Sequence, residues 1–369
     1  MLSLGAPAAV AAAAFDAHAT ALAARQDWPP FVLVSGLLLI GLVARGDGLF
    51  EVAGAVVARA ARFPALLLLA VAALVAVVTV TLNLDTSVTF VTPVVLSAAR
   101  RSGRRLEPFA YLVLWMSNAG SLLLPGSNLT NLIVLAASRT NGAQFVARLA
   151  APWGAAAVCV VLLVAAFWRS SVFGPPGART LADGRARLGP GVLGVAVAIV
   201  AMLISAPQVS AIIVAGTGLV LVAYQRASRH VGAGEIGERL NVPLLVGLFG
   251  AACALGTLGR DWSGPHQALG HLGLFATAGI GAGTSILVNN LPAASLLAAR
   301  HVAHPGALLV GLNLGPNLVV SGSLAGLLWL QASRASGFSA SIRRTSALGL
   351  AVVPATMACA LAALLAASN

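Results

Sequence analysis

The sequence predicts an all-α integral membrane protein whose helices either cross the bilayer or turn back inside it. Three observations lead to this fold class. Of the 369 residues, 59% are hydrophobic and 9% are charged, whereas about a quarter of the residues in a soluble domain carry charge. With a mean hydropathy of +0.94, the apolar side chains could not all be buried in one water-soluble core. Apolar runs long enough to cross a bilayer also recur along the whole chain.

These apolar runs, of about 20 residues each, define the expected spans. They lie near residues 28–44, 106–138, 150–168, 190–205, 208–225, 242–258, 305–333 and 345–366. A weaker run, residues 4–24, is rich in alanine but contains Asp16 and His18, so it is either a span or a helix at the membrane surface. It lacks the basic start and the cleavage site of a signal peptide. We therefore expect about eight or nine full spans.

The basic residues indicate how the chain is oriented. All 22 are arginines, and with ten acidic residues they give a net charge of +12. They lie between apolar runs, as the loop charges of a membrane protein do, so no nucleic acid partner is expected. If regions 64–99 and 267–299 each return to the side from which they start, seventeen arginines lie on one side and five on the other. The richer side is then cytoplasmic, and for a cell inner (plasma) membrane protein the cytoplasmic loops are 45–63, 100–105, 169–188, 226–241 and 334–344.

Two apolar regions are interrupted by polar residues near their middle. Region 64–99 is broken at 83–86 (NLDT), and region 267–299 is broken at 289–292 (NNLP). After Asn290, nine residues precede Arg300, and nine helical residues cover about 14 Å, half of a hydrocarbon core of ~30 Å. We therefore expect two re-entrant helical hairpins whose tips stop near the midplane, one entering from each side.

Two long runs further along the chain are broken in matching ways. Segments 118–128 (NAGSLLLPGSN) and 313–323 (NLGPNLVVSGS) align without gaps at an offset of 195 residues, so that Asn118 matches Asn313. Unwound backbone is tolerated in a membrane only where protein or a watery cavity satisfies it. Glycines that pack and prolines that kink a helix are the simpler explanation of one such break. Four breaks paired by symmetry favour a solute site built from amides, hydroxyls and released backbone groups.

Each half of the chain therefore contains a hairpin, a broken transmembrane helix and a final span. Because the crossing at 190–205 is an additional span, the second half enters the membrane from the opposite side and has inverted topology. The expected domains are a first inverted repeat, 1–168; a cytoplasmic linker with a crossing helix, 169–207; and a second inverted repeat, 208–369. Broken helices that meet at the interface of two inverted repeats are the architecture of a secondary transporter.

One acidic residue stands apart from the others. The remaining nine lie in loops, near span ends or in the run 4–24, whereas Asp85 lies about midway along region 64–99. A carboxylate at the bilayer centre costs about 2.5–3.5 kcal/mol on insertion scales, so it usually lines a polar path. We interpret Asp85 as a proton- or cation-coupling residue. A helix cap on the second arm of the hairpin is the alternative, and both roles can hold together. The matching position, Leu291, is uncharged, so the expected coupling is asymmetric.

Other chemistry is not indicated. Cys159, Cys253 and Cys359 are far apart in apolar stretches, with neither metal-ligand spacing nor a disulfide framework. No histidine–glutamate metal motif, nucleotide-binding glycine loop or activated serine is visible. The sequence predicts a protein that is not an enzyme and that has no catalytic residues, no metal and no cofactor.

Four segments resemble a known family. They are LNLDTSVTFVTP (82–93), NAGSLLLPGSNLTNL (118–132), VNNLP (288–292) and LGPNLVVSGSLAGLLWL (314–330). Together they look like the arsenite/antimonite permease (ArsB-type) family of the ion transporter superfamily, over nearly the whole chain. The last segment is the most specific, and the first is shared with related sodium/proton antiporters and dicarboxylate carriers. The resemblance implies an inverted-repeat fold and efflux of trivalent arsenic or antimony hydroxides, in exchange for protons or with an ATPase partner.

The resemblance also implies a set of site residues. It places Asp85 and seven of the polar residues at the breaks around the substrate, and neighbouring residues of the same breaks complete the predicted site. The predicted substrate-binding residues are Asn83, Thr86, Asn118, Gly120, Ser127, Asn128, Asn289, Asn290, Asn313, Gly315, Ser321 and Ser323. The chain departs from the family pattern at Leu84, where a second asparagine is common, at Asn317, where a basic residue is common, and at Val320, which replaces a usual proline.

Two transport functions fit these residues. The first is proton-coupled efflux of arsenite-like or antimonite-like small solutes, because a small neutral polyol suits a cage of amides and hydroxyls. The alternative is a sodium- or proton-coupled anion or dicarboxylate carrier, or a sodium/proton antiporter of the same superfamily, in which half-helix dipoles or bound sodium would neutralise an anion. The expected partners are the lipid bilayer, the solute, and protons or sodium. The related folds often form homodimers, and an ATPase partner is one arrangement that the resemblance implies.

Overall fold

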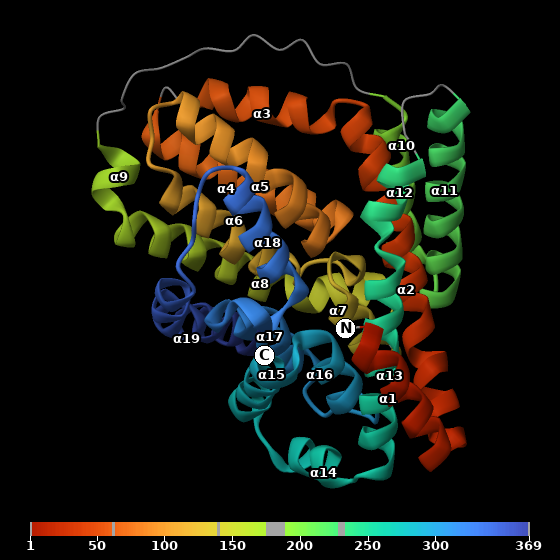
Figure 1. Ribbon diagram of the computed structural model, residues 1–369. Helices are drawn as coiled ribbons and strands as arrows, with labels where there is room; N and C mark the ends of the chain where they lie inside the picture. Colours follow the sequence, from red (N-terminus) through yellow and green to blue (C-terminus); the bar gives the residue numbers. More distant parts are fainter. Residues whose placement is uncertain (1, 61–62, 139–140, 175–188, 228–232, 368–369) are drawn as a thin grey trace.

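The computed structural model describes residues 2–60, 63–138, 141–174, 189–227 and 233–367. Within these ranges the chain is almost entirely helical and contains no strand, as the sequence predicts (Figure 1). The α-helices are α1 (Leu2–Phe15), α2 (Ala17–Gly46), α3 (Leu49–Ala60), α4 (Pro64–Leu82), α5 (Leu84–Arg101), α6 (Leu106–Gly120), α7 (Leu129–Ser138), α8 (Gly142–Phe167), α9 (Arg169–Phe173), α10 (Gly191–Ile204), α11 (Pro207–Ala227), α12 (Ala233–Leu240), α13 (Val242–Asp261), α14 (Gly264–His271), α15 (Leu274–Val288), α16 (Asn290–Leu297), α17 (Pro305–Leu314), α18 (Leu324–Ala335) and α19 (Ile342–Ala366). Short 3-10 turns are η1 (Pro125–Ser127), η2 (Gly315–Leu318) and η3 (Val320–Gly322).

Several of the helices have the length and composition of membrane spans. In the described part of the chain, six helices are long and apolar enough to cross a bilayer. They are α2, α4, α8, α11, α13 and α19. Shorter apolar helices, among them α10 and α15, lie between them. This composition confirms the prediction of a multi-pass membrane protein.

Both predicted helical hairpins are present, whereas the depth of their tips in the bilayer stays a prediction, because α4 is itself long enough to span. The first consists of α4 and α5, joined at Asn83, and the second consists of α15 and α16, joined at Asn289. The first hairpin lies in the upper half of Figure 1 and the second in the lower half, so the two enter from opposite ends of the molecule. Their arms differ in length: 19 and 18 residues in the first hairpin, but 15 and 8 residues in the second.

The two hairpin tips share an unusual backbone conformation. Asn83 has φ 119 and Asn289 has φ 77, and both have extended ψ values. This region of backbone space is normally restricted to glycine and costs about 1–3 kcal/mol for other residues. Each asparagine also caps the arm that follows it. The Asn83 Oδ1 atom accepts a hydrogen bond from the Thr86 amide at 2.7 Å, and the Asn289 Oδ1 atom accepts one from the Leu291 amide at 3.4 Å.

Both long runs that the sequence marks as broken are interrupted helices. In the first, α6 ends at Gly120 and α7 starts at Leu129, with η1 between them. In the second, α17 ends at Leu314 and α18 starts at Leu324, with η2 and η3 between them. The final spans α8 and α19 follow the two broken helices and pack against each other. The predicted fold, with two hairpins and two broken helices, is therefore confirmed.

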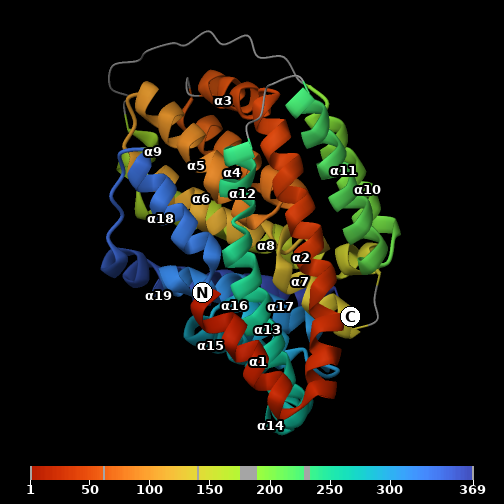
Figure 2. The same cartoon turned by 45° about the vertical axis from the view of Figure 1, so that its right-hand side comes forward.

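The remaining long helices stand together on one side of the molecule. We call α1, α2, α10, α11, α12 and α13 the helical wall; they form the right-hand side of Figure 1 and remain adjacent in Figure 2. Helices α2 and α11 touch through glycines, since a Cβ atom on Gly218 would lie 2.8 Å from the Gly36 carbonyl oxygen. In Figure 1 the two hairpins, α4–α5 and α15–α16, lie to the left of this wall.

The N-terminal run differs from the sequence-based expectation. Residues 4–24 do not form one segment, because α1 ends at Phe15 and a new helix starts at Ala17. The physical reason is Asp16, whose carboxylate accepts a hydrogen bond from the Ala19 amide at 2.8 Å and so caps α2. Helix α2 therefore starts well before residue 28 and places eleven further residues in the same helix as the first predicted span.

The arrangement of the helices does not determine the orientation in the membrane or the boundaries of the repeats. Parts of the predicted cytoplasmic loops 45–63, 169–188 and 226–241 lie outside the described residues. The orientation in the membrane and the division into repeats 1–168 and 208–369 therefore stay predictions.

The hairpin tip leads to a stability prediction. We expect Asn83→Ala to lower the apparent unfolding temperature of the purified protein, because alanine removes the cap, worth about 1 kcal/mol, and keeps the strained backbone. Asn83→Gly should cost less, because glycine adopts this φ freely. Asn141→Ala is the matched control, because Asn141 caps α8 from an ordinary backbone conformation. Equal losses for Asn83→Ala and Asn83→Gly would contradict the prediction.

Candidate functional site

Polar side chains bond to one another where the two broken helices meet. Five amides and one hydroxyl take part, each at most 7% exposed. We call this set the amide cluster: Asn118, Ser121, Asn128, Asn131, Asn313 and Asn317. The first four come from the first broken helix and the last two from the second. The cluster carries no charge, and it joins the two halves of the chain.

Asn313, near the end of α17, lies at the centre of the amide cluster. Its Oδ1 atom accepts hydrogen bonds from Ser121 Oγ at 2.6 Å and from Asn128 Nδ2 at 2.7 Å. Its Nδ2 atom donates to Asn131 Oδ1 at 2.9 Å and to the Leu309 carbonyl at 2.9 Å. The side chain thus makes four hydrogen bonds, which is the full capacity of an amide.

A second amide pair in the cluster is only partly satisfied. Asn118 Nδ2 donates to Asn317 Oδ1 at 2.8 Å and to the Leu114 carbonyl at 3.0 Å. Among the described residues, Asn118 Oδ1 and Asn317 Nδ2 have no hydrogen-bond partner, although both atoms are buried. An unpartnered buried polar group is costly. Within the described part of the chain, this hydrogen-bonded pair therefore keeps one acceptor and one donor unsatisfied.

The first hairpin meets the first broken helix. Ser127 Oγ in η1 donates to the Val80 carbonyl at 3.2 Å, one turn before the hairpin tip. Gly120 packs against the same arm, since a Cβ atom there would lie 3.2 Å from the Thr79 Cβ atom. At the tip itself, Asn83 Nδ2 and Thr86 Oγ1 are buried and have no hydrogen-bond partner among the described residues.

The second hairpin meets the second broken helix in the same way. Asn289 Nδ2 donates to the Ser321 carbonyl at 3.4 Å. Gly315 packs against α15, since a Cβ atom there would lie 2.6 Å from the Ala282 Cα atom. Ser323 caps α18 by accepting a hydrogen bond from the Gly326 amide at 3.2 Å, and Asn290 at the tip is 5% exposed.

The structure thus divides the predicted site residues into groups. Asn118, Asn128 and Asn313 lie together in the amide cluster. The others lie at the contacts of each hairpin with its own broken helix, at the hairpin tips, or at a helix cap. Their list is Asn83, Thr86, Gly120, Ser127, Asn289, Asn290, Gly315, Ser321 and Ser323. Whether any of them binds a solute stays a prediction.

Sequence reasoning did not select three members of the cluster. Ser121 lies inside segment 118–128 but is aligned with a proline. Asn131 lies in α7, one turn after Asn128, and donates to the Ser121 and Leu124 carbonyls at 2.6 and 3.1 Å. Asn317, noted only as a departure from the family pattern, pairs with Asn118. A search for asparagines one helical turn from each break would have found Asn131.

Asp85 lies in the first turn of α5 and is half-buried. The cap of this helix is Asn83, whose side chain accepts the hydrogen bond from the Thr86 amide. The carboxylate of Asp85 is therefore not needed as the cap. Its role as a coupling residue stays a prediction.

The interrupted helices also shape the electrostatics. Helices α5, α7, α16 and α18 start at a hairpin tip or at a break, while α4, α6, α15 and α17 end there. A helix N-terminus carries partial positive charge and a C-terminus partial negative charge. Half-helix N-termini favour anions, and C-terminal carbonyls favour cations. The region can therefore hold a neutral polar solute, or an ion placed against the matching helix ends.

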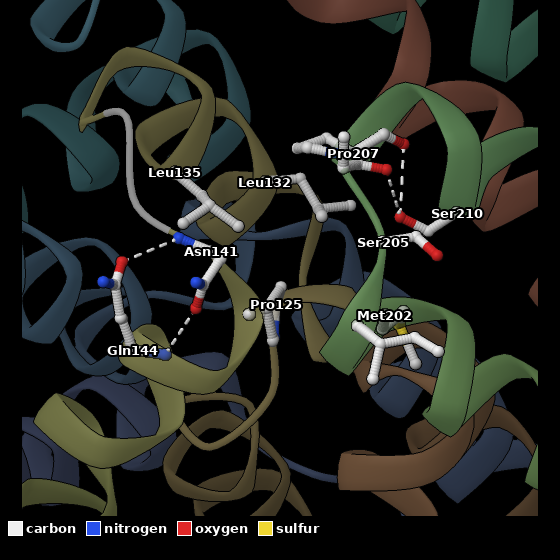
Figure 3. A pocket seen from close by; sticks show the side chains of 12 residues that line it. Pro125, Leu132, Leu135, Asn141, Gln144, Met202, Ser205, Pro207 and Ser210 are labelled. Atoms are coloured by element: carbon white, nitrogen blue, oxygen red, sulfur yellow. Dashed lines mark hydrogen bonds between the residues drawn. The ribbon is translucent and has the colours of Figure 1, made fainter.

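Cavities open on two sides of this region. One, of about 430 Å³, lies between the first broken helix and the α10–α11 connection. Figure 3 shows its lining, with Pro125 of η1, Met202 and Ser210 of the helical wall, and the hydrogen-bonded pair Asn141 and Gln144. A second, of about 420 Å³, lies beside the end of α2 and is lined by α5 and α18.

Two hairpins, two broken helices and a buried polar cluster between them, in a chain with membrane-length helices, define a membrane transporter. The chain belongs to the citrate transporter (CitMHS) family, whose sequence model matches residues 2–321. The family and the fold indicate a carrier rather than an enzyme. They confirm the predicted class of membrane transporter, while the closer resemblance to arsenite/antimonite permeases stays a prediction.

A solved structure shares the fold. The YdaH transporter of Alcanivorax borkumensis, which is described as having an unusual topology, is similar with a TM-score of 0.55 and 15% sequence identity. The similarity covers 90% of this chain and 84% of that one. Among curated proteins, none matches the chain.

The central amide leads to a second stability prediction. Asn313→Ala should leave Ser121 Oγ and Asn128 Nδ2 without their acceptor and Asn131 Oδ1 without its donor. Each buried polar group left unpaired costs about 1–3 kcal/mol, so we expect a marked fall in the apparent unfolding temperature in detergent. Asn141→Ala, at an exposed cap, is the control. The prediction fails if the two variants unfold at the same temperature.

Proposed function

We propose that the chain is a secondary active transporter that exports small uncharged hydroxylated solutes, of the arsenite and antimonite type, in exchange for protons. The observation that carries the proposal is the uncharged amide cluster at the meeting point of the two broken helices. Its unpartnered acceptor, Asn118 Oδ1, and unpartnered donor, Asn317 Nδ2, lie within one hydrogen-bonded pair.

The chemistry of the cluster suits such a solute. A trihydroxide of arsenic or antimony offers O–H groups that both donate and accept, and it carries no charge that must be neutralised. Amide side chains present the complementary donor and acceptor. Asn317 stands where the resembled family commonly has a basic residue. Because Asn317 is uncharged, the cluster offers an anion no cation and suits a neutral molecule.

Alternating access would use the hairpins. Each hairpin contacts its own broken helix, through Ser127 and Val80 in one half and through Asn289 and Ser321 in the other. The cavity of about 430 Å³ lies beside the α10–α11 connection, and the cavity of about 420 Å³ lies beside the end of α2. Movement of the hairpins and broken helices against the helical wall would expose the cluster to each side in turn. This movement requires neither the homodimer that the related folds often form nor the ATPase partner that the resemblance implies.

An anion carrier is the second candidate. The observation that favours it is the set of four half-helix N-termini, those of α5, α7, α16 and α18, which suit negative charge. The family is named for citrate, a carboxylate that such N-termini could receive with sodium or protons bound beside it.

Transport by everted membrane vesicles distinguishes the two candidates. We expect arsenite and antimonite to accumulate when the vesicle interior is acidified, and accumulation to fall to background when the pH gradient is collapsed. Asn118→Ala should lose this uptake, because it removes the free acceptor. Ser341→Ala, which changes an exposed helix cap away from the cavities, should keep it. Sodium-dependent uptake of citrate without any response to arsenite would overturn the first candidate in favour of the second.

The coupling role of Asp85 has its own test. Asp85→Asn should abolish accumulation driven by the pH gradient, because an amide cannot take up and release a proton. Asp261→Asn, which changes an exposed acid at the end of α13, is the control and should transport as the unmodified protein does. Unchanged proton coupling in Asp85→Asn would exclude this residue from the coupling step.

A further inference from the structure

A second carboxylate lies inside the protein at a place that the sequence does not reveal. Sequence reasoning placed Asp27 among the acids near span ends. The structure corrects this, because α2 starts at Ala17 and Asp27 lies ten residues inside it, with 1% of its surface exposed. Asp27 is thus a deeply buried carboxylate of the helical wall.

Asp27 contacts the second hairpin. Ser295, in the short arm α16, donates a hydrogen bond from Oγ to Asp27 Oδ2 at 3.1 Å. The same hydroxyl lies 3.5 Å from the Leu291 carbonyl in its own helix. The Ser295 hydroxyl can therefore point either to the carboxylate or to its own backbone.

The hairpin arm is held closely against the wall at this point. Gln26, the neighbour of Asp27, donates from Nε2 to the Ala298 carbonyl at 3.0 Å and to the Ile133 carbonyl at 3.2 Å. Gly259 of α13 allows the backbones to touch, since a Cβ atom there would overlap the Leu296 carbonyl oxygen. Asp27 thus lies in the contact through which the second hairpin docks.

The charged groups around Asp27 do not pair with it. Of the ionisable groups of α13, Arg260 acts electrostatically on the Asp27 carboxylate, and the carboxylate in turn acts on the Cys253 thiol. The Arg260 guanidinium bonds instead to Gln26 Oε1 and to the Gly256 carbonyl. The described parts of α1, α7 and α16 contribute no acidic or basic side chain to this contact. Within the described ranges, the ion pair present is Arg344 with Glu107, far along the chain.

A buried carboxylate without an ion pair is costly in its charged form, so a proton or water must accompany it. A cavity of about 290 Å³ lies next to this contact, lined by Gln26, Ala299 and the basic side chains of Arg25 and Arg300. Asp27 itself does not line this cavity, but its neighbour Gln26 does, together with the titratable His301. A proton from water in the cavity would therefore reach the carboxylate past Gln26.

We propose that Asp27 is a second coupling carboxylate and that its protonation controls the docking of the second hairpin on the helical wall. In the charged form, Ser295 donates to Asp27. When hydronium from the cavity gives its proton to Asp27, water is left behind, and the carboxyl group can donate to Ser295 Oγ. The Ser295 hydroxyl then donates to the Leu291 carbonyl of its own helix. The hydrogen bond between α16 and α2 is thus reversed in direction, and the docking of α16 changes with it.

This inference rests on the proposed function for its place in a transport cycle, but not for the titration itself. Asp85 lies at the tip of the first hairpin, and Asp27 lies beside the second. Leu291, the position in the second hairpin that matches Asp85, is uncharged. In this proposal Asp27 of α2 supplies the carboxylate beside the second hairpin. Each hairpin has one carboxylate that can respond to protons.

Infrared difference spectroscopy on the purified full chain in lipid nanodiscs tests the titration without any solute. A pH change should produce a protonated-carboxyl band that is lost in Asp27→Asn. The band should move to higher frequency in Ser295→Ala, because the hydrogen bond is removed. Asp261→Asn should give the spectrum of the unmodified protein. Identical spectra for Asp27→Asn and the unmodified protein would overturn the proposal.

Transport by everted membrane vesicles, as used above for the solute, tests whether Asp27 couples solute movement to protons. Asp27→Asn should lose accumulation driven by the pH gradient, while solute–solute exchange, which moves no net protons, continues. If Asp27→Asn does not fold, Ser295→Ala carries the test, with a shifted pH dependence of uptake. An unshifted pH dependence in Ser295→Ala, or full gradient-driven accumulation in Asp27→Asn, would overturn the coupling role. If no tested solute moves but the infrared band responds as expected, the solute assignment fails and the titration of Asp27 stands.

Discussion

Inside a bilayer, every polar group released from a helix must find a partner within the protein, because lipid offers none. The two broken helices meet much of this demand through each other, and Asn118 Oδ1 and Asn317 Nδ2 are the buried atoms of the cluster that, among the described residues, it leaves unpartnered. Asn313 of one satisfies Ser121, Asn128 and Asn131 of the other, and Asn131 in turn satisfies two carbonyls of the unwound stretch. Each break therefore takes part of its hydrogen bonding from the other, and the two halves of the chain are joined at the point where a solute site is expected.

The sequence predicts the fold well because interruptions are conspicuous in an apolar chain. The tips at Asn83 and Asn289 and the paired breaks at Asn118 and Asn313 all lie where helices end in the structure. Partners across the interface could not be predicted in the same way. Asn131 looks like an ordinary helical residue until Asn313 is placed beside it, because repeat symmetry relates equivalent positions and does not identify contacts between them.

Asp27 shows a second limit of sequence reasoning. Its depth depends on where α2 begins, and that is decided by one cap, Asp16. Counted from residue 28, Asp27 lies outside the span; counted from Ala17, it lies inside a helix of 30 residues. Helix starts are set by local hydrogen bonds that hydropathy does not report, so an acid near a predicted boundary is easily assigned to the wrong environment.

The neutrality of the amide cluster has an electrical consequence. Moving one elementary charge through 100 mV changes its energy by about 2.3 kcal/mol, but five amides and a hydroxyl carry no net charge to move. With a neutral solute bound, the membrane potential can do work only on carboxylates and the protons they carry. Any electrogenic step of this transporter would then originate at Asp85 or Asp27. The voltage dependence of transport would depend on those two residues and not on which neutral solute is bound.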